Sequence, residues 1–134
     1  MKAGEDLAKT IERGSIVAME GPLGAGKTCF AKGIARGLGI VEEVTSPTYT
    51  IVSEYDGFID GEKLTMFHID AYRLTGNEDF SALGGEEMVF GNGISVIEWS
   101  ERIPDFIPPG AVNVKIELKN DNERLIHIYK ERNR

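Results

Sequence analysis

The chain has 134 residues, the length of one ordinary domain, and an ordinary 41% of hydrophobic residues. No run of about 18 apolar residues occurs, so no membrane-spanning helix is expected. Acidic residues outnumber basic ones by 22 to 15, and the net charge is −7. A domain that grips a nucleic-acid backbone by itself normally has the opposite balance, so any contact with RNA is expected to be indirect.

Cysteine content and the N-terminal segment indicate the compartment. Cys29 is the only cysteine, so no intramolecular disulfide can form. The first residues carry acids and lack the apolar stretch of a secretory signal. We therefore expect a single domain over residues 1–134 in a reducing, cytoplasmic setting, without a membrane partner.

The first part of the chain predicts a strand between two helices. Leu7, Ala8 and Ile11 have helical spacing, and Gly14 ends that pattern. Residues 15–20 (SIVAME) form a short apolar run of strand length. Residues 27–38 place apolar side chains on one helical face.

The rest of the chain predicts mainly strands. We expect them at residues 50–55, 64–70, 94–99, 112–118 and 124–129, the last two as a hairpin. We interpret DGFIDGE as turn, residues 77–88 as a short helix broken by two glycines, and IPDFIPPG as a proline-rich loop. This order predicts an α/β domain whose sheet is parallel near its first strand and antiparallel toward the C-terminus.

A phosphate-binding loop follows the first strand. Residues 21–28 read GPLGAGKT and match G-x-x-x-x-G-K-[ST]. Glycines let the backbone turn tightly and expose its N–H groups to an anion, and the helix that follows adds its positive end. In such a loop the lysine reaches the β- and γ-phosphates and the threonine hydroxyl binds Mg²⁺. The candidate nucleotide-binding residues are Gly21, Pro22, Leu23, Gly24, Ala25, Gly26, Lys27 and Thr28.

Acidic residues end two later strands. Asp70 follows LTMFHI, where its carboxylate could hold a metal or a metal-bound water, or simply cap a turn. Glu98 ends ISVIE, a position typical of a metal-directed acid, with a general base or a solvent-facing glutamate as alternatives. We expect His68 to be packed or hydrogen bonded rather than catalytic, and Trp99 to serve either the core or a partner surface.

A third polar segment, TSPTYT at residues 45–50, precedes a strand. Its hydroxyl groups, beginning with Thr45, could sense a γ-phosphate as a switch does, or could belong to a simple polar loop.

In this order, GPLGAGKT, TSPTYT, HIDAYRL and IEW resemble the TsaE family, the small ATPases of threonylcarbamoyladenosine biosynthesis on bacterial tRNA. The resemblance implies a P-loop NTPase fold with three layers, and ATP or ADP with Mg²⁺ as cofactors. It also implies a TsaB–TsaD protein complex as the partner, so that tRNA is met only through that complex.

The resemblance further implies roles for individual residues. The loop with Lys27 would bind phosphates, Thr28 and Glu98 would bind Mg²⁺, and Asp70 would be an acid needed for hydrolysis. Thr45 would be switch-like, and Arg124 would lie near the base. The chain has only 20 residues before Gly21, whereas the family usually has a longer segment there, part of which can approach the adenine.

Three other functions compete. A small-molecule kinase of the P-loop class is the alternative, but it usually needs an arginine-bearing helical lid, and a proline loop and strands follow Glu98 instead. A GTPase usually has an N-K-x-D motif, which this sequence lacks. A binding module without hydrolysis would not need both Asp70 and Glu98.

Overall fold

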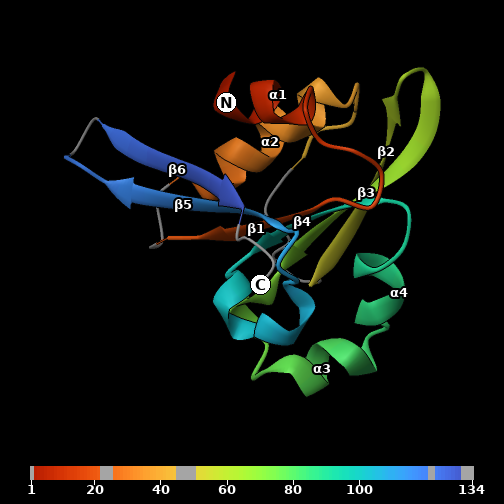
Figure 1. Cartoon of the computed structure of the whole chain (residues 1–134), viewed down its shortest axis with the longest axis vertical. Coiled ribbons are helices and arrows are strands. Elements are labelled where there is room, and N and C mark those ends of the chain that lie inside the picture. The colour runs from red at the N-terminus through yellow and green to blue at the C-terminus, as the bar shows by residue number, and fades with distance from the viewer. Residues whose placement is uncertain (1, 22–25, 45–50, 121–122, 131–134) are drawn as a thin grey trace.

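The computed structural model describes residues 2–21, 26–44, 51–120 and 123–130. A six-stranded sheet with the order β2-β3-β4-β1-β5-β6 forms its centre (Figure 1). Its strands are β1 Ile16–Glu20, β2 Val52–Ile59, β3 Glu62–Asp70, β4 Ile94–Glu98, β5 Val112–Leu118 and β6 Arg124–Lys130. The α-helices are α1 Lys2–Ala8, α2 Lys27–Gly37, α3 Asn77–Ala82 and α4 Gly85–Val89.

The four inner strands are parallel and both edges are antiparallel. β4 lies between β3 and β1, and β5 pairs with the other side of β1. The β5–β6 hairpin at the C-terminus confirms the prediction. The sequence did not predict a second antiparallel hairpin, which β2 and β3 form at the other edge.

That second hairpin depends on a two-residue turn. Ile59 pairs with Glu62, and Asp60 and Gly61 between them both have positive φ, at 52° and 79°. Asp-Gly is a preferred sequence for such primed turns, because these residues tolerate the left-handed region. The strand therefore continues through residues 56–59, which the sequence analysis assigned to a turn.

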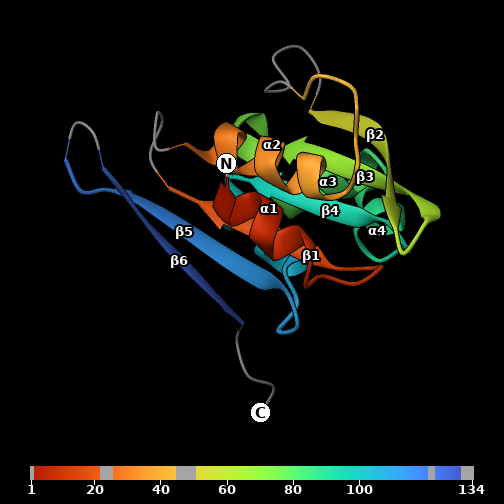
Figure 2. The same ribbon diagram turned by 90° about the horizontal axis from the view of Figure 1, so that it is seen from above.

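Helices cover both faces of the sheet, which gives three layers (Figures 1 and 2). The helices α1 and α2 lie on one face, over a core that includes Val17, Met19 and Ile34. The short helices α3 and α4, with 3₁₀ turns at Ala71–Arg73 (η1), Ser100–Arg102 (η2) and Pro104–Phe106 (η3), cover the other face. The β5–β6 hairpin extends past the helices (Figure 2), and all seven residues of β6 are exposed.

Two predicted elements differ in detail. The first helix ends at Ala8, and Ile11 is buried beyond its end. The segment IPDFIPPG contains one 3₁₀ turn, η3, because Pro104 occupies the first helical position, where its missing N–H costs nothing. No helix within the described residues is both long and apolar enough to cross a bilayer.

Candidate functional site

Three strand ends meet at one edge of the sheet because β3, β4 and β1 are parallel. Asp70 is paired with Glu98, and Glu98 with Met19, the residue before the last of β1. The candidate loop leaves β1 at Gly21 and enters α2 at Lys27. The parallel pairing therefore brings together the loop and the two predicted acids.

A glycine with a left-handed backbone connects the loop to helix α2. Gly26 has φ 99° and caps α2, and its carbonyl accepts a hydrogen bond from Phe30 N at 2.9 Å. No described atom lies within 4 Å of the position where a Cβ would be, so the space beside it is open. The first amides of the 11-residue helix α2 can therefore face an anion, with the helix dipole favouring negative charge. Pro22, Leu23, Gly24 and Ala25 lie outside the described residues.

Lys27 is folded back onto its own loop. Its side chain is buried, its Nζ donates a hydrogen bond to the Gly21 carbonyl at 2.6 Å, and it lies 3.5 Å from the centre of the Trp99 ring. Burial lowers the pKa of Lys27, although Glu98, Glu101 and Asp70 favour the charged form. The ammonium group is thus held in place but poorly solvated before any phosphate is present.

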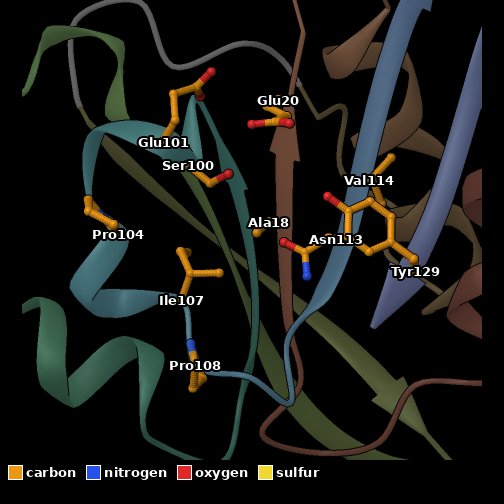
Figure 3. Close-up of a pocket in the computed structure, with 10 residues that line it drawn as sticks. All are labelled: Ala18, Glu20, Ser100, Glu101, Pro104, Ile107, Pro108, Asn113, Val114 and Tyr129. Carbon is orange, nitrogen blue, oxygen red and sulfur yellow. The ribbon is translucent and has the colours of Figure 1, made fainter. Parts of the chain in front are cut away.

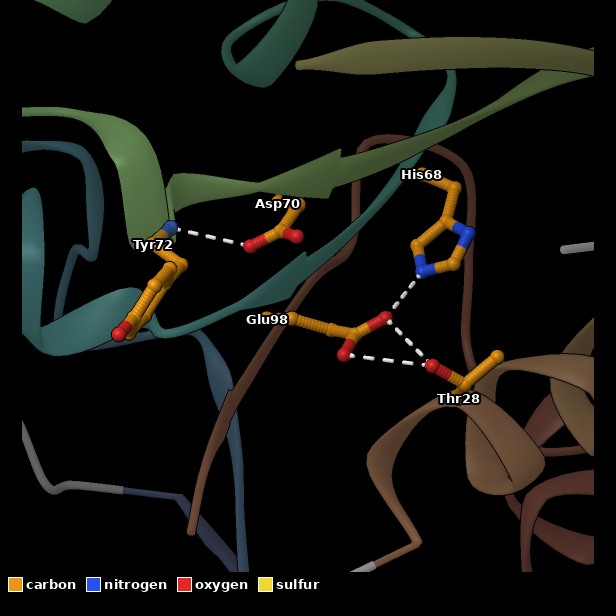
Figure 4. A network of polar contacts seen from close by, with 5 residues as sticks. All are labelled: Thr28, His68, Asp70, Tyr72 and Glu98. Atoms are coloured by element: carbon orange, nitrogen blue, oxygen red, sulfur yellow. Dashed lines mark hydrogen bonds and ion pairs between the residues drawn. The ribbon is translucent and has the colours of Figure 1, made fainter. Parts of the chain in front are cut away.

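Glu98 is buried at the end of the central strand and faces the loop helix (Figure 4). Thr28 Oγ1 lies 3.3 Å from Glu98 Oε2 and 3.5 Å from Oε1, and His68 Nε2 lies 2.6 Å from Oε2. Glu98 is only 5% exposed, so the alternative of a solvent-facing glutamate was wrong. A buried carboxylate beside a threonine hydroxyl provides two oxygen donors of the kind that Mg²⁺ prefers.

Asp70 caps the turn that follows its strand. Its Oδ1 accepts a hydrogen bond from Tyr72 N at 3.0 Å (Figure 4), which confirms the capping interpretation. The same residue is half-buried and paired with Glu98 on the neighbouring strand. Capping therefore fixes Asp70 at the site edge and is compatible with its proposed chemical role.

Trp99 adopts a left-handed backbone, with φ 59°, directly after β4. Its half-buried ring packs against the core beneath α3 and α4 and also contacts Lys27. The centres of the Tyr72 and Trp99 rings are 4.9 Å apart. The guanidinium carbon of Arg102 lies 5.4 Å from the centre of the Tyr72 ring. The structure thus confirms that Trp99 packs against the core and adds a contact with the loop lysine, whereas its partner-facing role stays a prediction.

Comparison with known proteins identifies the family. A family model described as threonylcarbamoyl adenosine biosynthesis protein TsaE matches residues 1–126. The chain belongs to the TsaE family.

Its relatives support that assignment over most of their length. A protein of Treponema pallidum named tRNA threonylcarbamoyladenosine biosynthesis protein TsaE is 44% identical over 125 residues, covering 93% of this chain and 89% of that protein. A Bacillus subtilis protein of the same name is 41% identical over 113 residues, covering 84% and 68%. The crystal structure of Bacillus subtilis YdiB superimposes with a TM-score of 0.71 at 35% identity, covering 95% of this chain and 76% of that one. The fold is thus that of a P-loop NTPase.

Thr45 and Arg124 are the remaining candidates of this TsaE-family chain. Thr45 is outside the described residues. Arg124 pairs with Leu118 at the outer end of the hairpin, three residues beyond Lys115, which pairs with Glu20. At about 3.3 Å per residue, this places Arg124 about 10 Å past the end of β1, in the direction in which the chain continues to Gly21. A contact between Arg124 and the base stays a prediction.

A pocket of about 320 Å³ lies on the opposite face of the sheet, between β1, β5 and the turns after β4 (Figure 3). None of its lining residues is basic, and its polar side chains come from Glu20, Ser100, Glu101, Asn113 and Tyr129. Two carboxylates without a cation would repel phosphates. This pocket therefore does not fit a phosphate, and the candidate phosphate site stays at Lys27 and Thr28, on the face covered by α2.

Sequence reasoning missed how closely His68 and Tyr72 approach the site. His68 contacts Glu98, and Tyr72 contacts both Asp70 and Trp99. A signal for His68 was available, because residues two apart in a strand share a face and His68 precedes Asp70 by two. No equivalent signal existed for Tyr72, which lies in the 3₁₀ turn η1.

Replacing Lys27 with methionine should not destabilise the nucleotide-free protein. Lys27→Met removes a poorly solvated charge, so we expect an unchanged or higher free energy of unfolding at neutral pH, by on the order of 1 kcal/mol. Because the pKa of Lys27 is lowered in the folded state, the wild-type protein gains stability as the pH rises toward the ordinary lysine value. The difference in free energy of unfolding between Lys27→Met and wild type should therefore shrink as the pH rises.

Chemical denaturation at several pH values measures this difference, with exposed Lys9→Met as the control. A Lys27→Met protein that is clearly less stable than wild type would show that Lys27 stabilises the loop rather than straining it.

Proposed function

We propose that this chain is a Mg²⁺-dependent ATPase that serves the biosynthesis of threonylcarbamoyladenosine on tRNA. The observation that carries the proposal is the buried carboxylate of Glu98, which faces the hydroxyl of Thr28 at the start of the loop helix. The names of the Treponema pallidum and Bacillus subtilis relatives support the biosynthetic role. The charge of −7 supports indirect contact with tRNA.

The residues present fit a nucleotide with Mg²⁺. Open space beside Gly26 leaves room for phosphate oxygens, and Lys27 provides a cation. No group of three or more His, Cys, Asp or Glu side chains gathers within the described residues. Mg²⁺ is commonly held by one or two side chains together with substrate phosphates and water, so Thr28 and Glu98 are sufficient protein donors. When bound, Mg²⁺ would neutralise the charge that develops on the phosphates.

Hydrolysis assigns a separate task to each side chain. Lys27 would exchange the Gly21 carbonyl and the Trp99 ring for β- and γ-phosphate oxygens, which better solvate its charge. Glu98 and Thr28 would orient the metal. Asp70 is already fixed by its hydrogen bond from Tyr72 N. It would either orient the attacking water or accept a proton from it.

The partner is expected to complete the site. Within the described residues, the groups that hydrogen bond to or stack on Lys27, Thr28 and Glu98 include no arginine. An arginine finger typically contributes about 10³-fold or more to such reactions, so hydrolysis should be slow in the isolated chain. The resemblance to TsaE proteins implies that the partner is a TsaB–TsaD complex, on which this chain would act when it hydrolyses ATP.

Glu98→Gln tests the assignment of the acid. The amide keeps the size of the side chain but binds Mg²⁺ weakly, so Mg²⁺-dependent ATP turnover should fall by about 10²-fold or more. Nucleotide binding without Mg²⁺ should be retained, because the loop is intact. Steady-state phosphate release and equilibrium binding measure the two quantities, with exposed Glu54→Gln as the matched control. Turnover equal to wild type would remove Glu98 from the site.

Addition of the partner complex tests the biological role. ATP turnover should rise when TsaB and TsaD are added together, and the chain should be recovered with them in an ATP-dependent pull-down. Equal rates with and without the complex would contradict the regulatory role. If the chain instead phosphorylates a metabolite when it is incubated with cell extract and ATP, the small-molecule kinase is favoured.

A further inference from the structure

His68 is a fully buried polar side chain for which the proposed reaction has no use. It lies in β3, paired with Val96, so its ring faces α2 on the same side of the sheet as Asp70 and Glu98. Its Nε2 is 2.6 Å from Glu98 Oε2 (Figure 4). Burying an imidazole is costly unless it is hydrogen bonded, so this one contact largely accounts for its presence.

The surroundings of the ring determine which nitrogen donates. Nδ1 is buried and has no hydrogen-bond partner in the described part of the chain. A hydrogen on Nδ1 would leave a buried donor unsatisfied, and it would leave Nε2 as an acceptor facing a carboxylate oxygen. The favourable tautomer therefore carries its hydrogen on Nε2 and donates it to Glu98 Oε2.

That hydrogen bond restricts Glu98. Its carboxylate is held by His68 on one side and by the Thr28 hydroxyl on the other. A glutamate side chain has three rotatable bonds and loses substantial entropy when it is fixed in one geometry. With His68 in place, this cost is met before the metal arrives. Groups that orient metal ligands in this way typically change metal affinity by about 10- to 100-fold when they are removed.

We propose that His68 is a positioning residue that holds the Glu98 carboxylate toward Thr28 and thereby sets the affinity of the nucleotide site for Mg²⁺. This inference rests on the proposed role of Glu98 as a Mg²⁺-directed acid. It does not require His68 to touch nucleotide, metal or water.

Ring nitrogen signals in the nucleotide-free protein provide the first test. The chain has two histidines, and the second, His127, is exposed and serves as an internal reference. Long-range ¹H–¹⁵N spectra should show His68 with its hydrogen on Nε2, slowly exchanging and shifted by Glu98→Ala. A ring without a hydrogen on Nε2, or a ring signal indifferent to Glu98→Ala, would overturn the proposal whether or not the protein hydrolyses ATP.

A Mg²⁺ titration of ADP binding provides the second test, with a fluorescent ADP analogue as the probe. Mg²⁺ is expected to tighten ADP binding, and His68→Leu should raise the Mg²⁺ concentration that gives half of this effect by about 10-fold. The affinity for ADP in EDTA should be unchanged. His68→Gln, whose amide reaches the position of Nε2, should stay within about threefold of wild type. Ser95→Ala is the matched control. The Ser95 hydroxyl, like His68 Nδ1, is buried without a hydrogen-bond partner in the described residues, but Ser95 belongs to β4, the strand next to β3.

Thermal unfolding confirms that each variant is folded. If His68→Leu does not fold, His68→Asn replaces it, since its shorter amide cannot reach Oε2.

The outcomes separate the two proposals. A raised Mg²⁺ requirement in Glu98→Gln with a normal one in His68→Leu overturns the role of His68 alone. Equal loss in His68→Leu and His68→Gln also overturns it, because packing rather than the hydrogen bond would then matter. A normal requirement in both Glu98→Gln and His68→Leu contradicts the role of Glu98 in the proposed function, and the inference fails with it.

Discussion

The parallel pairing of β4 between β3 and β1 is the constraint on which the site depends. Parallel strands end at the same edge of the sheet, so residues far apart in sequence arrive together there. Every residue of β4 is buried, and its last residue is Glu98. A carboxylate in that position is tolerated because Thr28 and His68 hydrogen bond to it. The site is thus part of the core, and the packing that stabilises the fold also positions the acid.

The site also keeps two buried opposite charges apart. Lys27 is hydrogen bonded to the Gly21 carbonyl and lies over the Trp99 ring. Glu98 is hydrogen bonded to Thr28 and His68. Neither charge neutralises the other by direct contact in the described structure. The proposed nucleotide would satisfy both, with phosphate oxygens on Lys27 and Mg²⁺ near Glu98. Such separation costs stability in the empty protein and favours binding, as is common at functional sites.

Much of this could be predicted from sequence where local pattern and chemistry agree. The loop, its strand and its helix were predicted because glycine spacing, an apolar run and helical periodicity occur in succession. Asp70 and Glu98 were predicted as candidates because each ends an apolar strand. The β2–β3 hairpin was missed because Asp60-Gly61 lies within a longer segment rich in turn residues, although it is the standard primed-turn pair.

Contacts between distant segments could not be predicted in this way. Strand alternation places His68 and Asp70 on one face, but only the register of β3 with β4 brings His68 to Glu98. The left-handed backbone of Trp99 is unusual for a bulky residue and is fixed by tertiary packing, so no local signal predicts its contact with Lys27. The same holds for the tilted contact between the rings of Tyr72 and Trp99.

The central claim is that Glu98 and Thr28 jointly hold Mg²⁺ against a nucleotide bound by the loop. A crystal structure of the chain with ADP and Mg²⁺ tests it most directly. We predict Mg²⁺ at about 2.1 Å from Thr28 Oγ1, with Glu98 as a direct ligand or hydrogen bonded to a metal-bound water. We also predict that Lys27 Nζ leaves Gly21 for the β-phosphate. A metal that contacts neither Thr28 nor the surroundings of Glu98, or phosphates bound away from Lys27, would contradict the account.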